Sequence, residues 1–162
     1  KENIRFYGGI YGLSNKYIKQ KTEDLLNRLK MTQIQNSLIS SLPLGWKQKI
    51  AFSVAIFHNP KVVFLDEPTA GLDPVGANAF DELILGLREA MNLTVLMVTH
   101  DLDSLYLICD RIAVLVDKHI PIADSLDRVS QYDHPWVQEY FGGPRSRAAI
   151  GASDAAASRQ KG

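Results

Sequence analysis

The sequence has a single cysteine, no long apolar run and no net charge, and each absence excludes a class of protein. Cys109 alone cannot form an internal disulfide, which fits a reducing compartment. The longest apolar run, residues 50–57, is interrupted by Ser53 and is too short to span a membrane, so we expect membrane contact only through partners. The 18 basic residues balance the 18 acidic ones, so the overall charge gives no reason to expect a nucleic-acid partner.

The charges are unevenly distributed along the chain. Residues 1–60 carry nine Lys or Arg against three Asp or Glu, whereas residues 61–135 carry five against thirteen. An acidic middle with carboxylates at strand ends suits a metal-bound nucleotide site, and it equally suits a solvated face. The positions of the individual carboxylates therefore matter more than their number.

Two adjacent carboxylates follow a short apolar run in the middle of the chain. The run, Val62 to Leu65, lies between Asn59-Pro60 and Pro68 and predicts a strand buried on both faces. Asp66 and Glu67 come at its C-terminal end, which is where ligands bind in open α/β sheets. The pair is therefore a candidate site, although a strand that simply ends in an acidic turn is also common.

The residues around this strand predict a βαβ unit preceded by helices. Apolar side chains recur at helical spacing over residues 16–29 and 46–58, and more weakly over 31–41. After the strand, Asp73 is a candidate N-cap with Pro74 at the first helical position. The helix that follows ends at Asn92, and the crossover rule makes the strand at 93–99 parallel to the first.

The last part of the chain predicts shorter elements. We expect a helix at 101–109, a strand at 111–116, an edge strand at 120–122 and a helix at 124–129. Residues 134–141 carry three aromatic side chains that must pack on something. Residues 151–162 are rich in Ala and Ser without periodicity and predict a flexible tail.

Four motifs, in the right order and rough spacing, resemble the ATP-binding subunit of ABC transporters. The strand ending in Asp66-Glu67 resembles the Walker B element, and Ala70-Gly71-Leu72-Asp73 resembles the D-loop. His100 resembles the switch histidine, and residues 42–49 (LPLGWKQK) resemble a variant of the signature sequence. The resemblance covers roughly residues 1 to 123.

The resemblance implies an α/β fold: a parallel sheet like that of P-loop NTPases, with flanking helices and a small helical subdomain. This chain would lack the strand that carries the P-loop. The expected domains are a helical subdomain with the signature at 1–58, an α/β core at 59–123, a C-terminal extension at 124–148 and a flexible tail at 149–162.

ATP and Mg²⁺ are the cofactors that the resemblance implies. Asp66 would supply carboxylate oxygen to Mg²⁺, a hard cation that prefers such ligands. Glu67 would orient and deprotonate the attacking water, and His100 would donate a hydrogen bond to the γ-phosphate. The other expected nucleotide contacts lie in the signature and the D-loop: Leu44, Gly45, Trp46, Lys47 and Asp73.

The phosphate-binding loop of this family, G-x-x-x-x-G-K-[ST], does not occur in the chain, in which no Gly is followed by Lys. In the family that loop precedes the helical subdomain, so we expect Lys1 to lie downstream of it in a longer protein. Accordingly, we expect the isolated chain neither to bind ATP tightly nor to hydrolyse it.

The signature also departs from the family pattern. Pro43 replaces a Ser and Leu44 replaces the first Gly, while Gly45 remains. Proline removes the hydroxyl and one backbone donor, so only backbone N–H groups at the helix N-terminus would reach the γ-phosphate of the opposite subunit. A subset of export-type ABC ATPases is similar here, which favours a working variant over a dead site.

The two halves of the chain resemble different subfamilies. The first sixty residues are similar to export-type ATPases, whereas residues 99–106 and 134–141 are similar to those of Mla-type phospholipid transporters. The latter carry a C-terminal extension that contacts neighbouring subunits, and the aromatic residues of 136–141 would suit such a contact. An equal alternative is that residues 136–141 cover the edge of the domain's own sheet. The cargo would then be phospholipid or an exported compound such as a drug.

The resemblance further implies a homodimer or a paired ATPase subunit, bound to a membrane-spanning permease at the cytoplasmic face of the bacterial inner membrane. Two alternatives stay open. The missing phosphate loop favours a non-catalytic fragment or regulatory module. An ATPase acting on nucleic acid or ribosomes is the other, but the neutral charge and the single copy of the motifs count against it.

Overall fold

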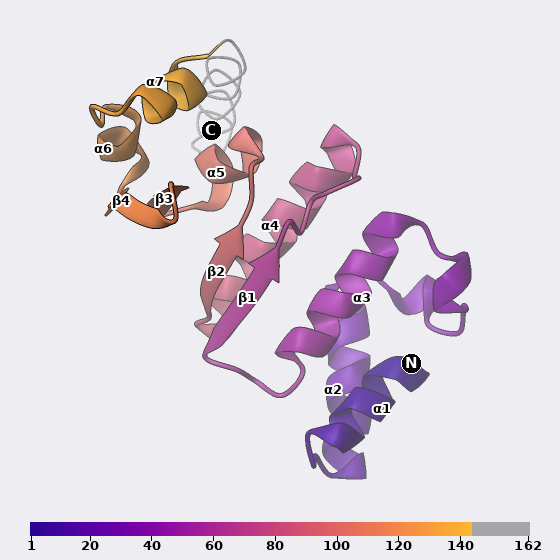
Figure 1. Cartoon of the computed structure of the whole chain (residues 1–162). Coiled ribbons are helices and arrows are strands. Elements are labelled where there is room, and N and C mark those ends of the chain that lie inside the picture. Colours follow the sequence, from indigo (N-terminus) through magenta and orange to yellow (C-terminus); the bar gives the residue numbers. More distant parts are fainter. Residues whose placement is uncertain (144–162) are drawn as a thin grey trace, which may run out of the picture. The chain divides into compact units, whose positions relative to one another are not determined.

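The computed structural model describes residues 1–143, which form two compact units. The first comprises Lys1–Val98, and the second begins at Thr99. Figure 1 labels their helices and strands. No helix among residues 1–143 is long and apolar enough to cross a membrane. The tail that we expect at 149–162 lies outside the described residues.

The first unit begins with three helices, α1 (Glu2–Ile10), α2 (Asn15–Arg28) and α3 (Leu44–Ile56), which pack together. Ser14 caps α2 by accepting a hydrogen bond from the backbone N–H of Tyr17 at 3.3 Å. Gly8 lets α1 approach closely, since a Cβ there would lie 2.9 Å from both Ile18 and Phe57. The weak helical pattern at 31–41 gives only two 3₁₀ turns, η1 (Thr32–Ile34) and η2 (Ile39–Ser41).

The predicted βαβ unit is confirmed. Strand β1 (Val62–Asp66) and strand β2 (Thr94–Val98) are parallel, and helix α4 (Pro74–Met91) connects them. Asn92 ends α4 in the left-handed conformation, with φ of 51°, as its small polar side chain tolerates. Figure 1 shows α4 behind the two strands, and its Phe80 ring packs against Phe52 of α3 at 5.9 Å.

The prediction that β1 is buried on both faces is wrong for the described residues. Val63 is buried, but Phe64, which points to the opposite face, is 74% exposed. Its neighbours on that face in β2, Leu96 and Val98, are also exposed. The reason is that, within residues 1–143, other parts of the chain cover only the face that carries Val63 and leave the opposite face of the two-stranded sheet open.

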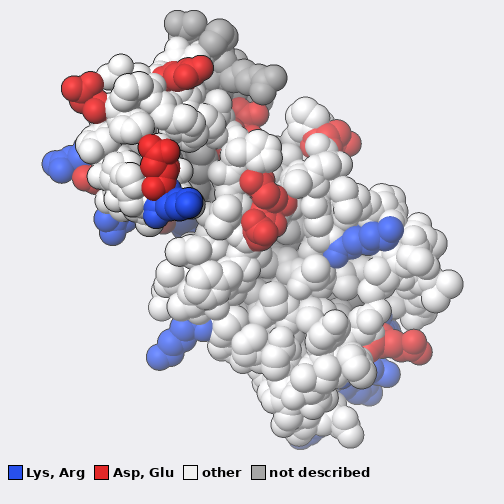
Figure 2. Space-filling model, in the orientation of Figure 1, with Lys and Arg blue, Asp and Glu red and all other residues white. Residues whose placement is uncertain are grey.

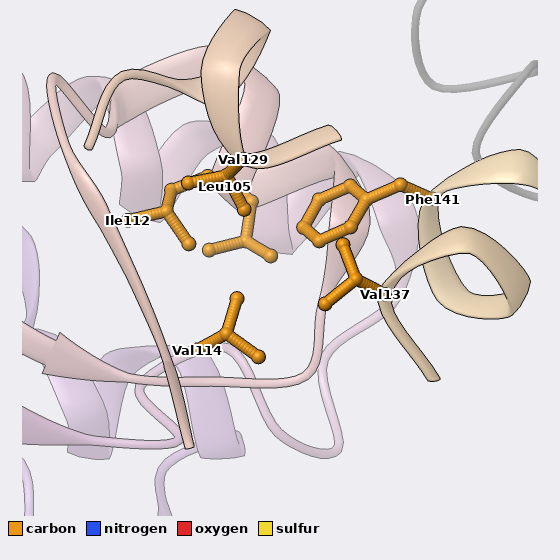
Figure 3. Close-up of a cluster of buried hydrophobic side chains, with 6 residues drawn as sticks. All are labelled: Leu105, Ile112, Val114, Val129, Val137 and Phe141. Atoms are coloured by element: carbon orange, nitrogen blue, oxygen red, sulfur yellow. The ribbon is translucent and has the colours of Figure 1, made fainter. Parts of the chain in front are cut away.

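The second unit contains an antiparallel pair of strands and three short helices. Helix α5 (Leu102–Ile108) precedes β3 (Ile112–Val116) and β4 (His119–Asp124), and α6 (Leu126–Ser130) and α7 (Pro135–Gly142) follow. Figure 3 shows its core, to which α5, β3, α6 and α7 contribute. The six buried side chains are Leu105, Ile112, Val114, Val129, Val137 and Phe141.

Candidate functional site

The carboxylate pair lies where β1 ends and the chain turns. Asp66 is the last residue of β1, and the backbone N–H of Glu67 donates to the carbonyl of Val98 at 2.8 Å, extending the pairing with β2 by one bond. Glu67 has φ of 44°, in the left-handed region that a side chain of its size seldom adopts. The backbone thus leaves the strand direction at Glu67, and a tight turn follows.

Asp66 is exposed and lies on the same face of β1 as Phe64. Among the described residues, no three His, Cys, Asp or Glu side chains gather into a metal cage. Mg²⁺ is usually bound through one or two carboxylates together with substrate phosphates and water, so the exposed carboxylate of Asp66 fits this ion. On the face drawn in Figure 2, acidic and basic side chains stand in small groups among uncharged ones.

The segment that resembles the D-loop links this turn to α4. The backbone N–H of Ala70 donates to the carbonyl of Glu67 at 3.1 Å, and Gly71 has φ of 75°. Asp73 then caps α4, since its Oδ1 accepts from the backbone N–H of Gly76 at 2.6 Å, and Pro74 takes the first helical position. The predicted cap is therefore confirmed.

The helix that carries the signature packs directly on the D-loop. Pro43 is the N-cap of α3 and provides no side-chain cap, so the helix starts with backbone donors alone, as its sequence predicts. A Cβ on Gly71 would lie 3.0 Å from Leu44, and one on Gly45 would lie 3.5 Å from Leu72. These contacts bring the signature and the D-loop together at the start of α3.

Gln48 adds a hydrogen bond to this contact. Its Nε2 donates to the carbonyl of Ala70 at 3.2 Å, and its Oε1 is buried without a hydrogen-bond partner among the described residues. Trp46 faces the cation of Lys49, whose Nζ lies 5.3 Å from the ring centroid. Sequence reasoning did not single out Gln48, because a hydrogen bond over 22 residues leaves no local signal.

His100 belongs to the second unit, in the loop between β2 and α5, where its side chain is exposed. Asp101 caps α5 by accepting from the backbone N–H of Asp103 at 3.1 Å, as expected of a helix N-cap. The backbone N–H of Asp101 donates to Thr99 Oγ1 at 3.1 Å. The carbonyl of His100 accepts a hydrogen bond from the Tyr140 hydroxyl at 2.8 Å, a contact that sequence reasoning missed.

The structure thus brings together Leu44 and Gly45 of the signature with the D-loop, and places Asp66 and Glu67 just before that loop. The family resemblance also implies that His100 steadies Glu67, and this stays a prediction, because the two residues belong to different units.

The other three histidines have local contacts. His58 packs on the Tyr11 ring at 4.2 Å, His119 Nδ1 lies 2.9 Å from the carbonyl of Asp117, and His134 is the N-cap residue of α7. His58 thus lies just after α3, His119 begins β4, and His134 precedes α7.

Comparison with known proteins gives one consistent family. Residues 1–70 match the family model described as "ABC transporter". The ATP-binding protein NatA of Bacillus subtilis is 34% identical over 71% of this chain and 46% of its own length. The methionine import ATP-binding protein MetN of Legionella pneumophila is 34% identical over 79% of this chain and 38% of its own length.

The fold agrees with these sequence relatives. CbiO1 of Clostridium perfringens, described as part of the ABC transporter complex cbiONQ, superposes with a TM-score of 0.66. The match is 26% identical and covers 82% of this chain and 49% of that one. The chain therefore spans less than half the length of these three relatives.

Proposed function

Because the chain belongs with the nucleotide-binding domains of ABC transporters, we propose that the complete protein binds and hydrolyses ATP to drive transport through a membrane-spanning permease. The observation that carries the proposal is the turn after β1. There the Asp66-Glu67 pair is followed directly by a D-loop that packs on the signature helix. Carboxylates at the C-terminal end of a parallel strand are placed where ligands bind in α/β sheets.

Each site residue has a role that its chemistry supports. Asp66 would hold Mg²⁺, which would supply positive charge beside the phosphates. Glu67 orients the attacking water and accepts its proton, a contribution of about 10²–10⁴-fold. His100 donates a hydrogen bond to the γ-phosphate. The backbone N–H groups of Leu44 and Gly45, together with the side chains of Trp46 and Lys47, face the γ-phosphate held by a second ATPase subunit, while the N–H groups of Trp46 and Lys47 donate to the carbonyl of Pro43. Asp73 contacts that subunit while capping α4.

Transport of phospholipid is the finer proposal for the cargo. It rests on the similarity of residues 99–106 and 134–141 to Mla-type ATPases. The names of the relatives above include methionine import, so the motor function is proposed independently of the cargo. The proposed location is the cytoplasmic face of the bacterial inner membrane, with membrane contact through the permease alone.

The substitution Glu67→Gln in the complete protein tests the proposal. It removes the proton acceptor while keeping the size of the side chain, so we expect ATP hydrolysis to fall by about 10²–10⁴-fold while ATP stays bound. Hydrolysis is measured by phosphate release and retention by filtration of labelled ATP. Glu82→Gln, an exposed carboxylate on α4, is the matched control and should hydrolyse ATP at the wild-type rate.

A hydrolysis rate for Glu67→Gln within about twofold of wild type would reject Glu67 as the base. An inactive wild-type complete protein would instead favour the second candidate function, a non-catalytic regulatory module. The observation that favours that candidate is the signature, in which Pro43 and Leu44 stand in place of a Ser and a Gly.

A further inference from the structure

A hydrogen bond ties the loop that carries His100 to helix α7. The Tyr140 hydroxyl donates to the backbone carbonyl of His100 at 2.8 Å, across 40 residues of sequence. Both residues belong to the second unit, so the bond lies within one compact body. Tyr140 lies in α7, the helix whose aromatic residues were expected to contact a neighbouring subunit or to cover the domain's own sheet edge.

The Tyr140 ring is held by its neighbours on α7. It stacks on Trp136 with ring centroids 4.9 Å apart and planes 11° apart, and it meets Phe141 edge to face at 5.0 Å. Phe141 and Val137 are buried in the core of the unit, and Tyr140 packs partly buried against that core (Figure 3 shows the core residues). The hydroxyl is therefore presented to the loop by a rigid aromatic group.

Local hydrogen bonds also shape the loop. Thr99 Oγ1 accepts a hydrogen bond from the backbone N–H of Asp101. The Asp101 carboxylate caps α5 through Oδ1, and its Oδ2 accepts a hydrogen bond from the hydroxyl of Ser104 at 3.4 Å. These bonds orient Asp101 and the start of α5. They do not reach the carbonyl of His100, which is the group that Tyr140 holds.

We propose that Tyr140 is a positioning residue for His100, which makes α7 a support for the switch loop. The bond fixes the peptide unit after His100, and so limits the directions in which the imidazole can point. The inference rests on the proposed function in assigning His100 to the γ-phosphate. Movement of α7, for example when a partner binds the exposed side of Trp136, would be transmitted to His100 by this bond.

The test is Tyr140→Phe in the complete protein, which removes the hydroxyl and keeps the ring contacts. Because the hydroxyl holds the backbone beside His100, we expect kcat for ATP hydrolysis to fall about threefold to tenfold. The KM for ATP should stay within about twofold, because the bond does not touch ATP, and the Tm should fall by no more than about 4 °C, since only one hydrogen bond is lost and the ring keeps its packing. Tyr132→Phe is the matched control, since Tyr132 packs on the same core but does not bond to the loop.

Two further measurements separate a positioning role from a merely structural one. In a His100→Ala background, Tyr140→Phe should cause no further loss of kcat, because the two residues act as one unit. In the ATP-free protein, the NMR resonances of the His100 imidazole should shift in Tyr140→Phe and stay in place in Tyr132→Phe.

The outcomes distinguish the two proposals. Equal kcat for Tyr140→Phe and wild type, additive losses in the double variant, or unshifted His100 resonances would each overturn the positioning role. Wild-type turnover in His100→Ala would overturn the assignment of His100 to hydrolysis. If the complete protein hydrolysed no ATP, the proposed function would fail, and the NMR comparison would still decide whether Tyr140 orients His100.

Discussion

The turn after β1 and the loop after β2 carry the two candidate catalytic side chains, yet they are held in different ways. Around Glu67 the chain is shaped by backbone hydrogen bonds, to Val98 at 2.8 Å and from Ala70 at 3.1 Å, and by the left-handed Gly71. Around His100 the bonds come from side chains, including one hydroxyl 40 residues away. The first arrangement depends on backbone conformation, whereas the second includes a bond that is lost when the Tyr140 hydroxyl is removed.

The largest effect should come from Gly71→Ala, which attacks the backbone arrangement. Gly71 has φ of 75°, and an added Cβ would lie 3.0 Å from Leu44. A left-handed conformation costs a side-chain-bearing residue about 1–2 kcal/mol, so the free energy of unfolding should fall by about that amount. Urea unfolding of the complete protein measures this loss, and we expect ATP hydrolysis to fall with it.

Gly86→Ala is the matched control for this prediction. Gly86 lies within α4, and an added Cβ would meet nothing within 4 Å. Alanine favours a helix over glycine, so this variant should be more stable by about 0.5–1 kcal/mol. If both glycine variants changed stability in the same direction, backbone conformation would not be what shapes the D-loop.

A smaller effect is expected from Gln48→Met, which removes a side-chain hydrogen bond to the turn after β1. Methionine keeps the length of the side chain but loses the bond to Ala70, whose exposed carbonyl can turn to water. It also removes a buried unpaired oxygen, so stability should change by less than about 1 kcal/mol while kcat falls about threefold. Phosphate release and thermal unfolding check the two expectations.

Lys47→Met on the same helix should lower kcat as well if the signature contacts ATP, but it should also raise the KM, which Gln48→Met should not. A rise in KM for Gln48→Met would show that Gln48 acts on the nucleotide and not on the D-loop.

The smallest effect is expected for stability at acid pH and concerns the Asp124 carboxyl of the second unit. The pKa of the Asp124 carboxyl is lowered from its ordinary value of 3.8, chiefly because the backbone N–H of Ser125 donates to it, with a smaller contribution from Arg128. A lowered folded pKa means stabilisation that is present above about pH 3.8 and is lost as the pH falls through the folded value. In Asp124→Asn this pH dependence should disappear from acid unfolding curves; an unchanged acid limb would contradict it.

Much of the fold could be predicted because its signals are local. Asp73-Pro74 begins α4 and Asn92 ends it, as cap chemistry requires, and the period of apolar residues sets the helix between them. The parallel pairing of the strands followed from the crossover rule. The family motifs likewise lie within short stretches, so the sequence alone could identify them.

The contacts that hold the candidate site could not be predicted in the same way. Gln48 to Ala70 and Tyr140 to His100 join residues far apart in sequence, and neither donor belongs to a pattern that marks its acceptor. The exposure of Phe64 was missed because an apolar run predicts burial and does not say what buries it. The left-handed Glu67 has no sequence signal either, since glutamate does not favour that conformation.

The uncovered face of the two-stranded sheet has a practical consequence. Phe64, Leu96 and Val98 are 74%, 52% and 57% exposed there, next to strand edges with unused pairing groups. At high concentration such a surface favours association between copies of the chain, through strand pairing at the edges and burial of the apolar side chains. Purification of these 162 residues by themselves would therefore call for dilute samples and a solubilising fusion partner.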